Sequence, residues 1–345
     1  GTNGQVLTTD GSGAVTFADA GGGSSYNLIV ENYTNGTSPT VTGTDSVAIG
    51  DSCVASGHDS FAAGYYATAA GSQSVAIGYQ AKVDAGSRGV AIGKSYVNKS
   101  DALAAVITNN TSSYGATGAN AIAMGQQSKA TGGQSTAIGN FAQATNTSAA
   151  AIGGYLPRAE GNSSLALGTH AQAEQAGGVA IGYRTKSKTT GKLAFNAAEP
   201  TGGMGTTNGA NQRGMYVLRR ATTDATQTVL SGNGGTVAAS NSWVPENNSA
   251  HAFSGTIIAR QDATDGNDYA AWEVKGAIMR ASNAASTVVG VAIINSLYHT
   301  SGSRAWDVPI DSNTTLGSCE VKVTGAASTN IQWVATIDTS EVVNA

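Results

Sequence analysis

The sequence predicts an all-β protein in which a stacked, solenoid-like region precedes a globular β domain. A five-residue motif returns about every 14 residues between Ser46 and Asn196, and a fixed period of this kind is typical of stacked architectures. Beyond residue 214 the period ends, and alternating apolar and polar runs replace it. All four tryptophans fall in this last part: Trp243, Trp272, Trp306 and Trp333.

The composition agrees with tightly wound β-structure. The chain has 345 residues, enough for two or three domains, with 46 glycines and only 12% charged residues. A net charge of −4 without a Lys/Arg cluster argues against nucleic acid as a partner. The absence of an 18-residue apolar run argues against membrane insertion. The chain begins at Gly1 without Met, as expected for a piece of a longer protein.

Residues 1–45 are predicted to form an N-terminal segment. Two β-prone runs, Gln5–Thr8 and Ala14–Phe17, flank an Asp-Gly turn signal and predict a hairpin. The glycine- and serine-rich residues 21–25 are typical of a flexible joint. One further strand is expected over Tyr26–Val30, ahead of the first repeat.

Residues 46–196 contain the repeat, whose motif Ser46-Val-Ala-Ile-Gly50 returns as Ser74-Val-Ala-Ile-Gly78 and in seven further variants. Fourteen residues accommodate two short strands with two tight turns, and glycine supplies the positive φ that such turns need. The valine and isoleucine side chains point to one face of the strand and the alanine to the other. We expect the bulky face to fill the interior opposite a small Ala/Ala strand.

The other apolar face needs a neighbour, because a single coil of this size encloses too thin a core. Side-by-side association of identical chains is therefore expected. About ten turns at ~4.8 Å each predict a rod on the order of 50 Å tall. The stretch Thr108–Ala119 breaks the period and predicts a polar loop, either a recognition feature or a tolerated surface excursion.

Residues 197–214 are a glycine-rich linker by composition, and residues 215–345 form the predicted globular domain. Short strand patterns separated by Gly, Asn, Asp and Ser indicate an antiparallel β-sandwich or jelly roll. The strand patterns are Met215–Arg219, Ala252–Arg260, Ala270–Met279, Thr287–Ile294, Cys319–Thr324 and Ile331–Ile337.

The Ser-Val-Ala-Ile-Gly unit resembles the head repeat of YadA-like trimeric adhesins over roughly residues 44–196. The resemblance implies a left-handed parallel β-roll assembled as a homotrimer. The same repeat occurs in bacteriophage tail fibres, and the opening Gly1-Thr-Asn-Gly-Gln-Val-Leu-Thr-Thr-Asp-Gly-Ser-Gly13 looks like segments of such fibres. Stretches such as Phe253–Arg260, Trp272–Ile278 and Ile331–Thr336 resemble their terminal domains.

These resemblances imply a tail fibre of the virion that attaches to a host cell-surface glycan or outer-membrane protein. Its partners would be two further copies of the chain and, through the missing N-terminal part, other virion tail proteins. A second interpretation is the head fragment of a bacterial trimeric autotransporter adhesin on the cell surface. A third is a tail-spike-like glycan depolymerase, which needs a pair of carboxylates at a set distance.

The sequence favours a binding protein over an enzyme. The acidic residues of the repeat are scattered at turn-like positions, and no nucleophile, phosphate-loop or zinc motif occurs. We therefore expect no catalytic residue, no cofactor and no metal site. The acidic run Asp262–Asp268 lacks the terminal glutamate of an EF-hand loop and is interpreted as a polar hairpin tip.

Candidate binding residues lie in the C-terminal part, since aromatic faces beside polar groups suit flat sugar surfaces. Trp306 and Trp333 sit inside alternating strand patterns and are expected in the core. Trp243, beside Pro245, is predicted to lie in a loop and to be available to a ligand. The other candidates, at or after the acidic run, are Asp265, Asn267, Tyr269 and Tyr298.

Overall fold

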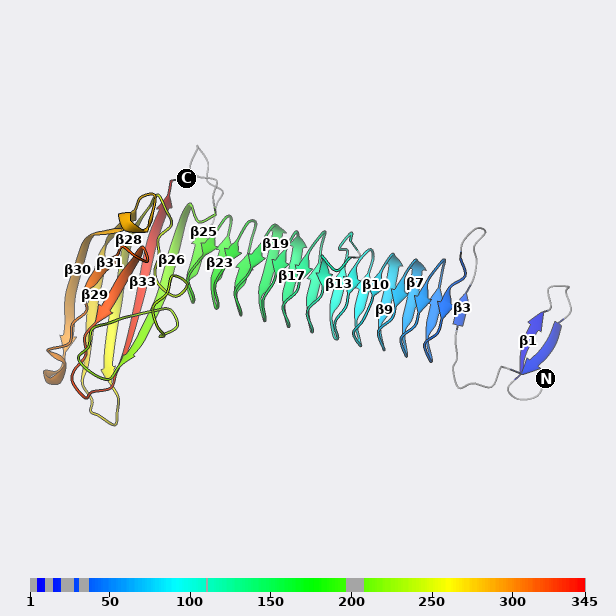
Figure 1. The fold of residues 1–345 in the computed structure, drawn as a ribbon, viewed down its shortest axis with the longest axis horizontal. Helices are drawn as coiled ribbons and strands as arrows, with labels where there is room; N and C mark the ends of the chain where they lie inside the picture. Colours follow the sequence, from blue (N-terminus) through cyan, green and yellow to red (C-terminus); the bar gives the residue numbers. More distant parts are fainter. Residues whose placement is uncertain are drawn as a thin grey trace.

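The computed structural model describes strands at residues 5–9, 15–19 and 28–30 and then residues 37–109, 111–196 and 208–344. Almost every element of this part is a β-strand; the exceptions are two short 3₁₀ turns, η1 (Ala284–Ser286) and η2 (Ser301–Ser303). Figure 1 shows a long rod of stacked turns with a tall sheet at one end. The prediction of an all-β chain with a parallel solenoid is confirmed.

The solenoid has about 11 turns, each contributing one strand to each of two parallel sheets. The first sheet contains β3 (Leu28–Val30), β5 (Val47–Ile49), β7 (Phe61–Tyr65), β9 (Val75–Tyr79), β11 (Val90–Ile92), β13 (Leu103–Ala105), β15 (Ile122–Met124), β17 (Thr136–Asn140), β19 (Ala150–Tyr155), β21 (Leu165–Leu167), β23 (Val179–Gly182) and β25 (Leu193–Asn196). The second contains β4 (Thr40–Val41), β6 (Val54–Ala55), β8 (Thr68–Ala69), β10 (Lys82–Val83), β12 (Tyr96–Val97), β14 (Gly115–Ala116), β16 (Lys129–Ala130), β18 (Gln143–Ala144), β20 (Arg158–Ala159), β22 (Gln172–Ala173) and β24 (Lys186–Ser187).

The interior of the solenoid is lined by alanine, which corrects the expectation that the bulky face fills it. The middle residue of each motif, as in Ala48, Ala76 and Ala151, is fully buried. The alanines of the second sheet face them, as Ala69 and Ala144 do. The valine and isoleucine of the motif point outward, and the interior encloses a few larger side chains, Val83, Val97 and Ile107, among its alanines.

The serine and the glycine of the motif are explained by the turns. The buried Ser135 hydroxyl donates to the Gly132 carbonyl at 2.7 Å, and Ser164 repeats the contact with Gly161 at the same distance. Gly139 has φ +130°, and a Cβ at this position would collide with the Gly153 carbonyl of the next turn. Stacked turns therefore require glycine at this corner.

The interruption after residue 107 leaves the sheets intact. Strand β13 pairs in register with β15, and β12 pairs with β14, across the extra residues. The additional length lies in the turn between β13 and β14, where Thr111 donates to the Asn109 side chain. The insertion is therefore shorter than the predicted loop Thr108–Ala119, because Gly115–Ala116 already form β14. Residue 110 lies outside the described residues.

The N-terminal strands also follow the sequence. Strands β1 (Gln5–Thr9) and β2 (Val15–Asp19) pair antiparallel, so the hairpin is confirmed. Strand β3 pairs in parallel with β5, so the first sheet begins before Ser46. The sequence predicted that the repeat region starts at Ser46. The predicted joint at residues 21–25 falls outside the described residues.

The first sheet of the solenoid continues into the C-terminal part without a break. Strand β25 pairs antiparallel with β26 (Asn211–Thr222), which pairs with β33 (Ile331–Val343). The sheet then runs through β28 (Ser249–Gln261) and β29 (Tyr269–Arg280) to the edge strand β30 (Val288–His299). Most of the predicted linker, residues 197–207, is outside the described residues, and residues 211–214 belong to β26.

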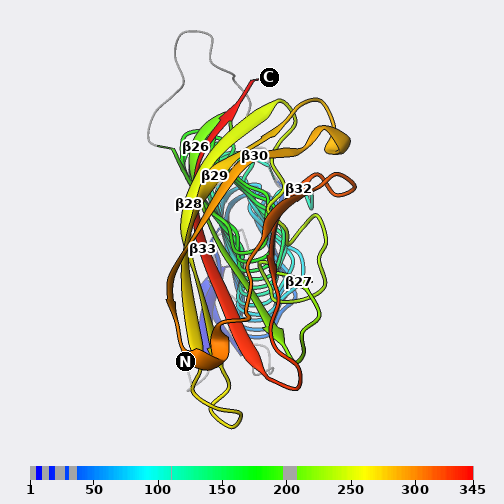
Figure 2. The ribbon, with the colours of Figure 1, turned by 90° about the vertical axis from the view of Figure 1, so that its left-hand side faces the viewer.

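A smaller antiparallel sheet covers one face of these long strands (Figure 2). It consists of β27 (Thr228–Val229), β32 (Ser318–Val323) and β31 (Ile310–Asn313). The core between the sheets contains large side chains, among them Trp333, Tyr216, Ile257 and Val321. The assignment of the C-terminal part to the sandwich or jelly-roll class stays a prediction. The left-handedness of the solenoid and its assembly as a trimer also stay predictions.

Candidate functional site

Tyr269 and Tyr298 form an exposed aromatic pair at the edge of the long C-terminal sheet. Their rings stack with centroids 5.0 Å apart and planes at 19°, and the side chains are 42% and 50% exposed. They come from the neighbouring strands β29 and β30. Hydrogen bonding to Tyr298 raises the pKa of Tyr269 above its ordinary value.

The turn at η2 fixes the backbone beside this pair. The Ser303 hydroxyl donates to the Tyr269 carbonyl at 2.9 Å, and the Tyr269 amide donates to the Thr300 hydroxyl at 3.1 Å. The ring of Tyr269 is therefore carried on a well-supported backbone, with polar groups at its rim. An aromatic surface of this kind, with hydrogen-bonding groups beside it, suits the apolar face of a sugar.

The two polar candidates lie in the loop between β28 and β29, next to the pair in sequence. Asp265 accepts hydrogen bonds from the backbone and side-chain amides of Asn330, both at 2.8 Å, so its carboxylate holds two loops together. Asn267 is exposed. Both residues belong to loops at the lower end of the C-terminal part in Figure 1, the end that also carries η2.

The prediction that Trp243 lies in an exposed loop is wrong, because this residue lies in the core. Its side chain is fully buried, its backbone bridges to Cys319, and its ring meets Phe253 edge to face at 5.1 Å. An indole enclosed in this way cannot stack on a ligand, so Trp243 is not a binding residue. The loop was predicted because Pro245 interrupts the strand pattern near Trp243, but this interruption does not expose the tryptophan side chain. Trp306 and Trp333 are buried as predicted.

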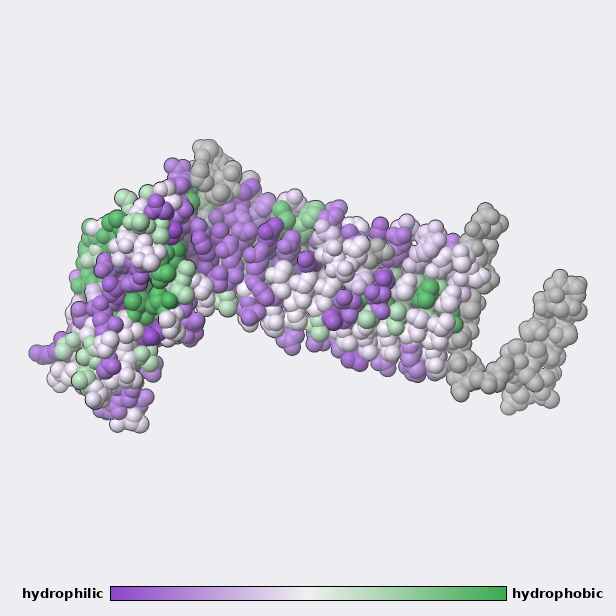
Figure 3. Space-filling model, in the orientation of Figure 1, coloured by the Kyte–Doolittle hydropathy of each residue, from purple (hydrophilic) through white to green (hydrophobic). Residues whose placement is uncertain are grey.

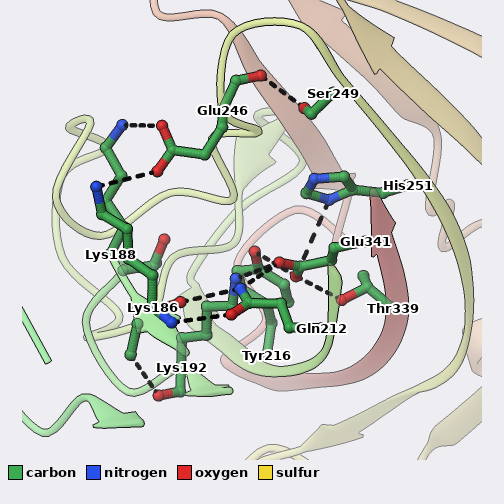
Figure 4. A network of polar contacts seen from close by, with 12 residues as sticks. Lys186, Lys188, Lys192, Gln212, Tyr216, Glu246, Ser249, His251, Thr339 and Glu341 are labelled. Atoms are coloured by element: carbon green, nitrogen blue, oxygen red, sulfur yellow. Dashed lines mark hydrogen bonds and ion pairs between the residues drawn. The ribbon is translucent and has the colours of Figure 1, made fainter. Parts of the chain in front are cut away.

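A buried polar network joins the last solenoid turn to the C-terminal sheet (Figure 4). Lys192 lies 2.8 Å from the Glu341 carboxylate, which also accepts from Gln212 at 2.6 Å and Thr339 at 2.7 Å. Trp243 Nε1 donates to His251 Nδ1 at 3.3 Å, so the imidazole accepts on that nitrogen. The space left between these groups is about 10 Å³, room for one water at most.

The electrostatics of this network identify it as a structural clamp. Burial opposes the charge of Glu341 most strongly, but Lys192 and His251 outweigh it and lower the carboxyl pKa to about 2. Burial lowers the pKa of His251 to about 4, so this imidazole is neutral at physiological pH. A buried charged pair that is hydrogen-bonded in this way holds the last solenoid turn and the C-terminal sheet together.

The two outer faces of the solenoid differ in chemistry. The first sheet presents apolar side chains on turn after turn, including Ile77 and Ile92 at 42% exposed and Phe195 at 47%. The second sheet presents mainly polar side chains. Its outward residues include Thr68, Lys82, Lys129, Gln143, Arg158 and Gln172.

One corner of the solenoid carries aromatic residues that sequence reasoning missed. Tyr65 and Tyr79 stack with centroids 5.5 Å apart, and further along the rod four rings touch on successive turns. The four residues, named here the aromatic ladder, are Phe141, Tyr155, His170 and Tyr183. The signal was available, because each residue follows the motif glycine by one to three positions.

Other groups with potential chemistry are weaker. Asp45, His58 and Asp59 place ligand atoms within 4.8 Å of one another, but all three are exposed and His58 already pairs with Asp59 at 2.8 Å. Cys53 and Cys319 are both free and buried. Within the described ranges, no helix is long and apolar enough to cross a membrane.

Comparison with known proteins identifies the repeat. Six stretches match the model of the YadA head domain repeat: residues 42–67, 55–81, 69–95, 116–142, 130–155 and 159–185. No curated protein sequence matches the chain. Among solved structures, the tailspike protein of Acinetobacter baumannii phage AM24 aligns with a TM-score of 0.21 and 9% identity.

That alignment covers 91% of this chain and 60% of the tailspike chain, so the sequence spans well under the tailspike's full length. A likeness at this TM-score carries no argument about fold or function. The family match does bear on the solenoid, where it coincides with the stacked turns. The chain therefore contains a parallel β-solenoid built from repeats similar to those of YadA heads.

Proposed function

We propose that this protein is a trimeric fibre or adhesin that attaches to a cell surface without catalysis. The solenoid serves as the shaft and the C-terminal sheets carry the contact. The observation that supports the assembly is the difference between the two outer faces of the solenoid. YadA head domains, whose repeat this chain shares, are trimeric in general.

The apolar face is too extended for an isolated chain. Outward side chains such as Ile77, Ile92 and Leu167 repeat along the rod, and each is at least 40% exposed. Contiguous apolar surface of this kind marks an interaction site, because its burial is favourable at roughly 25 cal/mol per Å². Every turn presents the same face, so a parallel copy meets like residues at every level.

The apolar surface continues past the last turn of the solenoid. Leu193 and Phe195 stand opposite Met215 and Arg213 across the β25–β26 pairing. A groove of about 270 Å³ lies between these side chains. Figure 3 shows apolar side chains gathered on the C-terminal part, beside a polar region of the solenoid in that view. Partner chains packed along the first sheet would also fill this groove.

Recognition is assigned to the Tyr269–Tyr298 pair. It is exposed and supported by the η2 turn, and it lies at the end of the molecule remote from the N-terminal hairpin. Three copies of a weak glycan site on one rigid shaft act together when the geometry permits. The ligand class proposed is a host surface glycan, with an outer-membrane protein as the alternative.

The finer assignment is a bacteriophage tail fibre in the virion. The opening residues and the C-terminal stretches that resemble phage fibres support it. The second candidate is the head of a bacterial trimeric adhesin, which the family match favours. Binding through the C-terminal sheets agrees with the first, and binding through the solenoid alone agrees with the second.

The assembly is tested by mass. Light scattering of the intact chain should give three times the chain mass of 34.3 kDa. Ile77→Asp combined with Ile92→Asp should shift the protein to monomer, because two charges then face the apolar interface. Gln143→Asp, on the polar second sheet, is the matched control and should remain trimeric. A wild-type mass near one chain would refute the assembly.

The contact is tested on whole cells of the host. Tyr269→Ala and Tyr298→Ala should each weaken binding by about tenfold per site, with a larger loss in the trimer. The control Arg304→Ala changes an exposed residue beyond η2 and should bind as the wild type does. Loss of trimer mass in the tyrosine variants would instead place the pair at a subunit contact. New reducing ends released from host polysaccharide would show that the protein is an enzyme.

A further inference from the structure

The aromatic ladder occupies one corner of the solenoid over four successive turns. Ring centroids lie 5.7 Å apart for Phe141 and Tyr155, 5.3 Å for Tyr155 and His170, and 6.4 Å for His170 and Tyr183. All three contacts are edge to face, at 72° to 79°. Backbone bonds hold the turns in register, for example from His170 N to Tyr155 O at 2.9 Å.

The backbone does not favour phenylalanine at this corner. Phe141 has φ +56°, in the left-handed region where glycine and asparagine are preferred and a bulky ring is uncommon. His170 has the same φ, but histidine is one of the residue types that adopt this region more readily. Other turns place Ser52, Gln80 or Gln127 at the equivalent position. The fold is thus built equally well without aromatic residues here, and their presence calls for another explanation.

The rings are accompanied by positive charge. The Arg184 guanidinium lies over the Tyr183 ring, 5.5 Å from its centroid. Arg158, on the second sheet, lies close enough that it and Arg184 add to the effect of burial in lowering the pKa of His170. The acid nearest to Arg158 is Glu160, at a loose 3.9 Å with both side chains 39% exposed. The corner therefore combines aromatic surface with two arginines, of which Arg158 is 39% exposed.

We propose that the aromatic ladder is a lateral binding site for an acidic linear polysaccharide. Sugar rings would pack their apolar faces on the aromatic rings, and Arg158 and Arg184 would attract the carboxylates. Contacts repeated at the spacing of the turns suit a chain-like ligand that lies along the rod. This site goes beyond the proposed function, because it is separate from the Tyr269–Tyr298 pair and lies on the shaft.

The decisive variant is Phe141→Asn in the full-length trimer. Asparagine accepts the positive φ, so thermal stability should be kept or slightly raised while one ring is lost. Binding to polygalacturonate, measured by calorimetry, should weaken about tenfold. Tyr66→Asn is the matched control: it removes a ring at the same type of position (φ +55°) in the other aromatic cluster and should leave affinity unchanged.

Charge is tested separately with Arg158→Gln and neutral dextran. The arginine variant should weaken polygalacturonate binding and reduce its salt dependence, and dextran should bind far more weakly. The proposal is wrong if the wild type binds none of polygalacturonate, hyaluronan and polysialic acid. It is also wrong if Phe141→Asn lowers the melting temperature or the trimer mass, which would make the ring a packing contact. Equal binding of oligo-dT would show a general polyanion surface instead.

Discussion

The solenoid and the C-terminal sheets fill their interiors in opposite ways. In the solenoid most of the fully buried apolar side chains are alanines, such as Ala48 and Ala76, and the larger Val83, Val97 and Ile107 are exceptions. In the C-terminal part the buried apolar side chains are large and each occupies a unique position, as Trp243, Trp333 and Ile257 do. The solenoid repeats a small set of interior contacts on every turn, whereas the C-terminal part has a single core of large side chains.

The two regions therefore obtain their stability from different contacts. A turn of the solenoid touches mainly its two neighbours, so its stability comes from stacking and from what covers its outer face. The C-terminal core buries its own large apolar groups and tolerates loss at one position poorly. The following predictions test this contrast, beginning with the largest expected effect.

Trp333→Ala should destabilise the C-terminal part by about 5 kcal/mol, because the ring is enclosed and the cavity cannot collapse. Trp333 stacks on Trp272 at 5.9 Å and donates to the Thr222 hydroxyl at 2.9 Å. Urea unfolding followed by tryptophan fluorescence measures the change. The exposed neighbour Gln332→Ala should leave the midpoint in place. A midpoint unchanged in Trp333→Ala would show that the C-terminal core is not closely packed around this ring.

Glu341→Gln should cost about 4 kcal/mol, because it leaves Lys192 charged and buried without its partner. The effect falls on the boundary between the regions, so the solenoid and the C-terminal part should then melt separately in calorimetry. Asp338→Asn is the matched control on the same strand. Its partner Arg213 is 68% exposed, and loss of that surface pair should cost less than about 1 kcal/mol.

Acidification should weaken the same boundary through His251. Its pKa is about 6.5 in the unfolded chain and about 4 in the folded protein, so the unfolded state binds the proton first. The free energy of unfolding should therefore fall by about 3 kcal/mol between pH 6.5 and pH 4. Protonation of Glu341, whose folded pKa is about 2, should lower it further below pH 4.5.

The variant His251→Asn checks the assignment, because asparagine keeps an acceptor for Trp243 without titrating. Unfolding measured across this pH range should show a flatter profile in the variant. An unchanged slope would mean that other groups cause the acid sensitivity.

Ala137→Val should destabilise the solenoid by about 2 kcal/mol, because the narrow interior has no room for two more methyl groups. Ala137 is fully buried and pairs with Ala123 and Ala151 on the adjacent turns. The control is Thr136→Val on the same strand, whose side chain faces outward and should be neutral. Circular dichroism on heating measures both. Equal tolerance of the two valines would show that the interior is not closely packed.

Much of the fold was predictable from local signals. The period of the motif identified stacked strands, since only a repeated structure needs the same residues at the same spacing. The hairpin of β1 and β2 followed from its turn residues, and the burial of Trp306 and Trp333 from alternation. The candidate site was predictable in part: Tyr269 and Tyr298 were named, but their stacking across two strands was not.

The repeat, the order of the regions and the small size of alternate side chains could all be predicted from the sequence, because these features depend on spacing along the chain. Which face of the motif points inward was visible only in the stacked turns, which bury Ala48 and leave Val47 partly exposed. The tertiary structure also decided that β25 and β26 join the regions into one sheet and that Lys192 meets Glu341 across them. Contacts between residues so distant in sequence depend on the path of the chain in the folded protein, and a local sequence pattern does not predict that path.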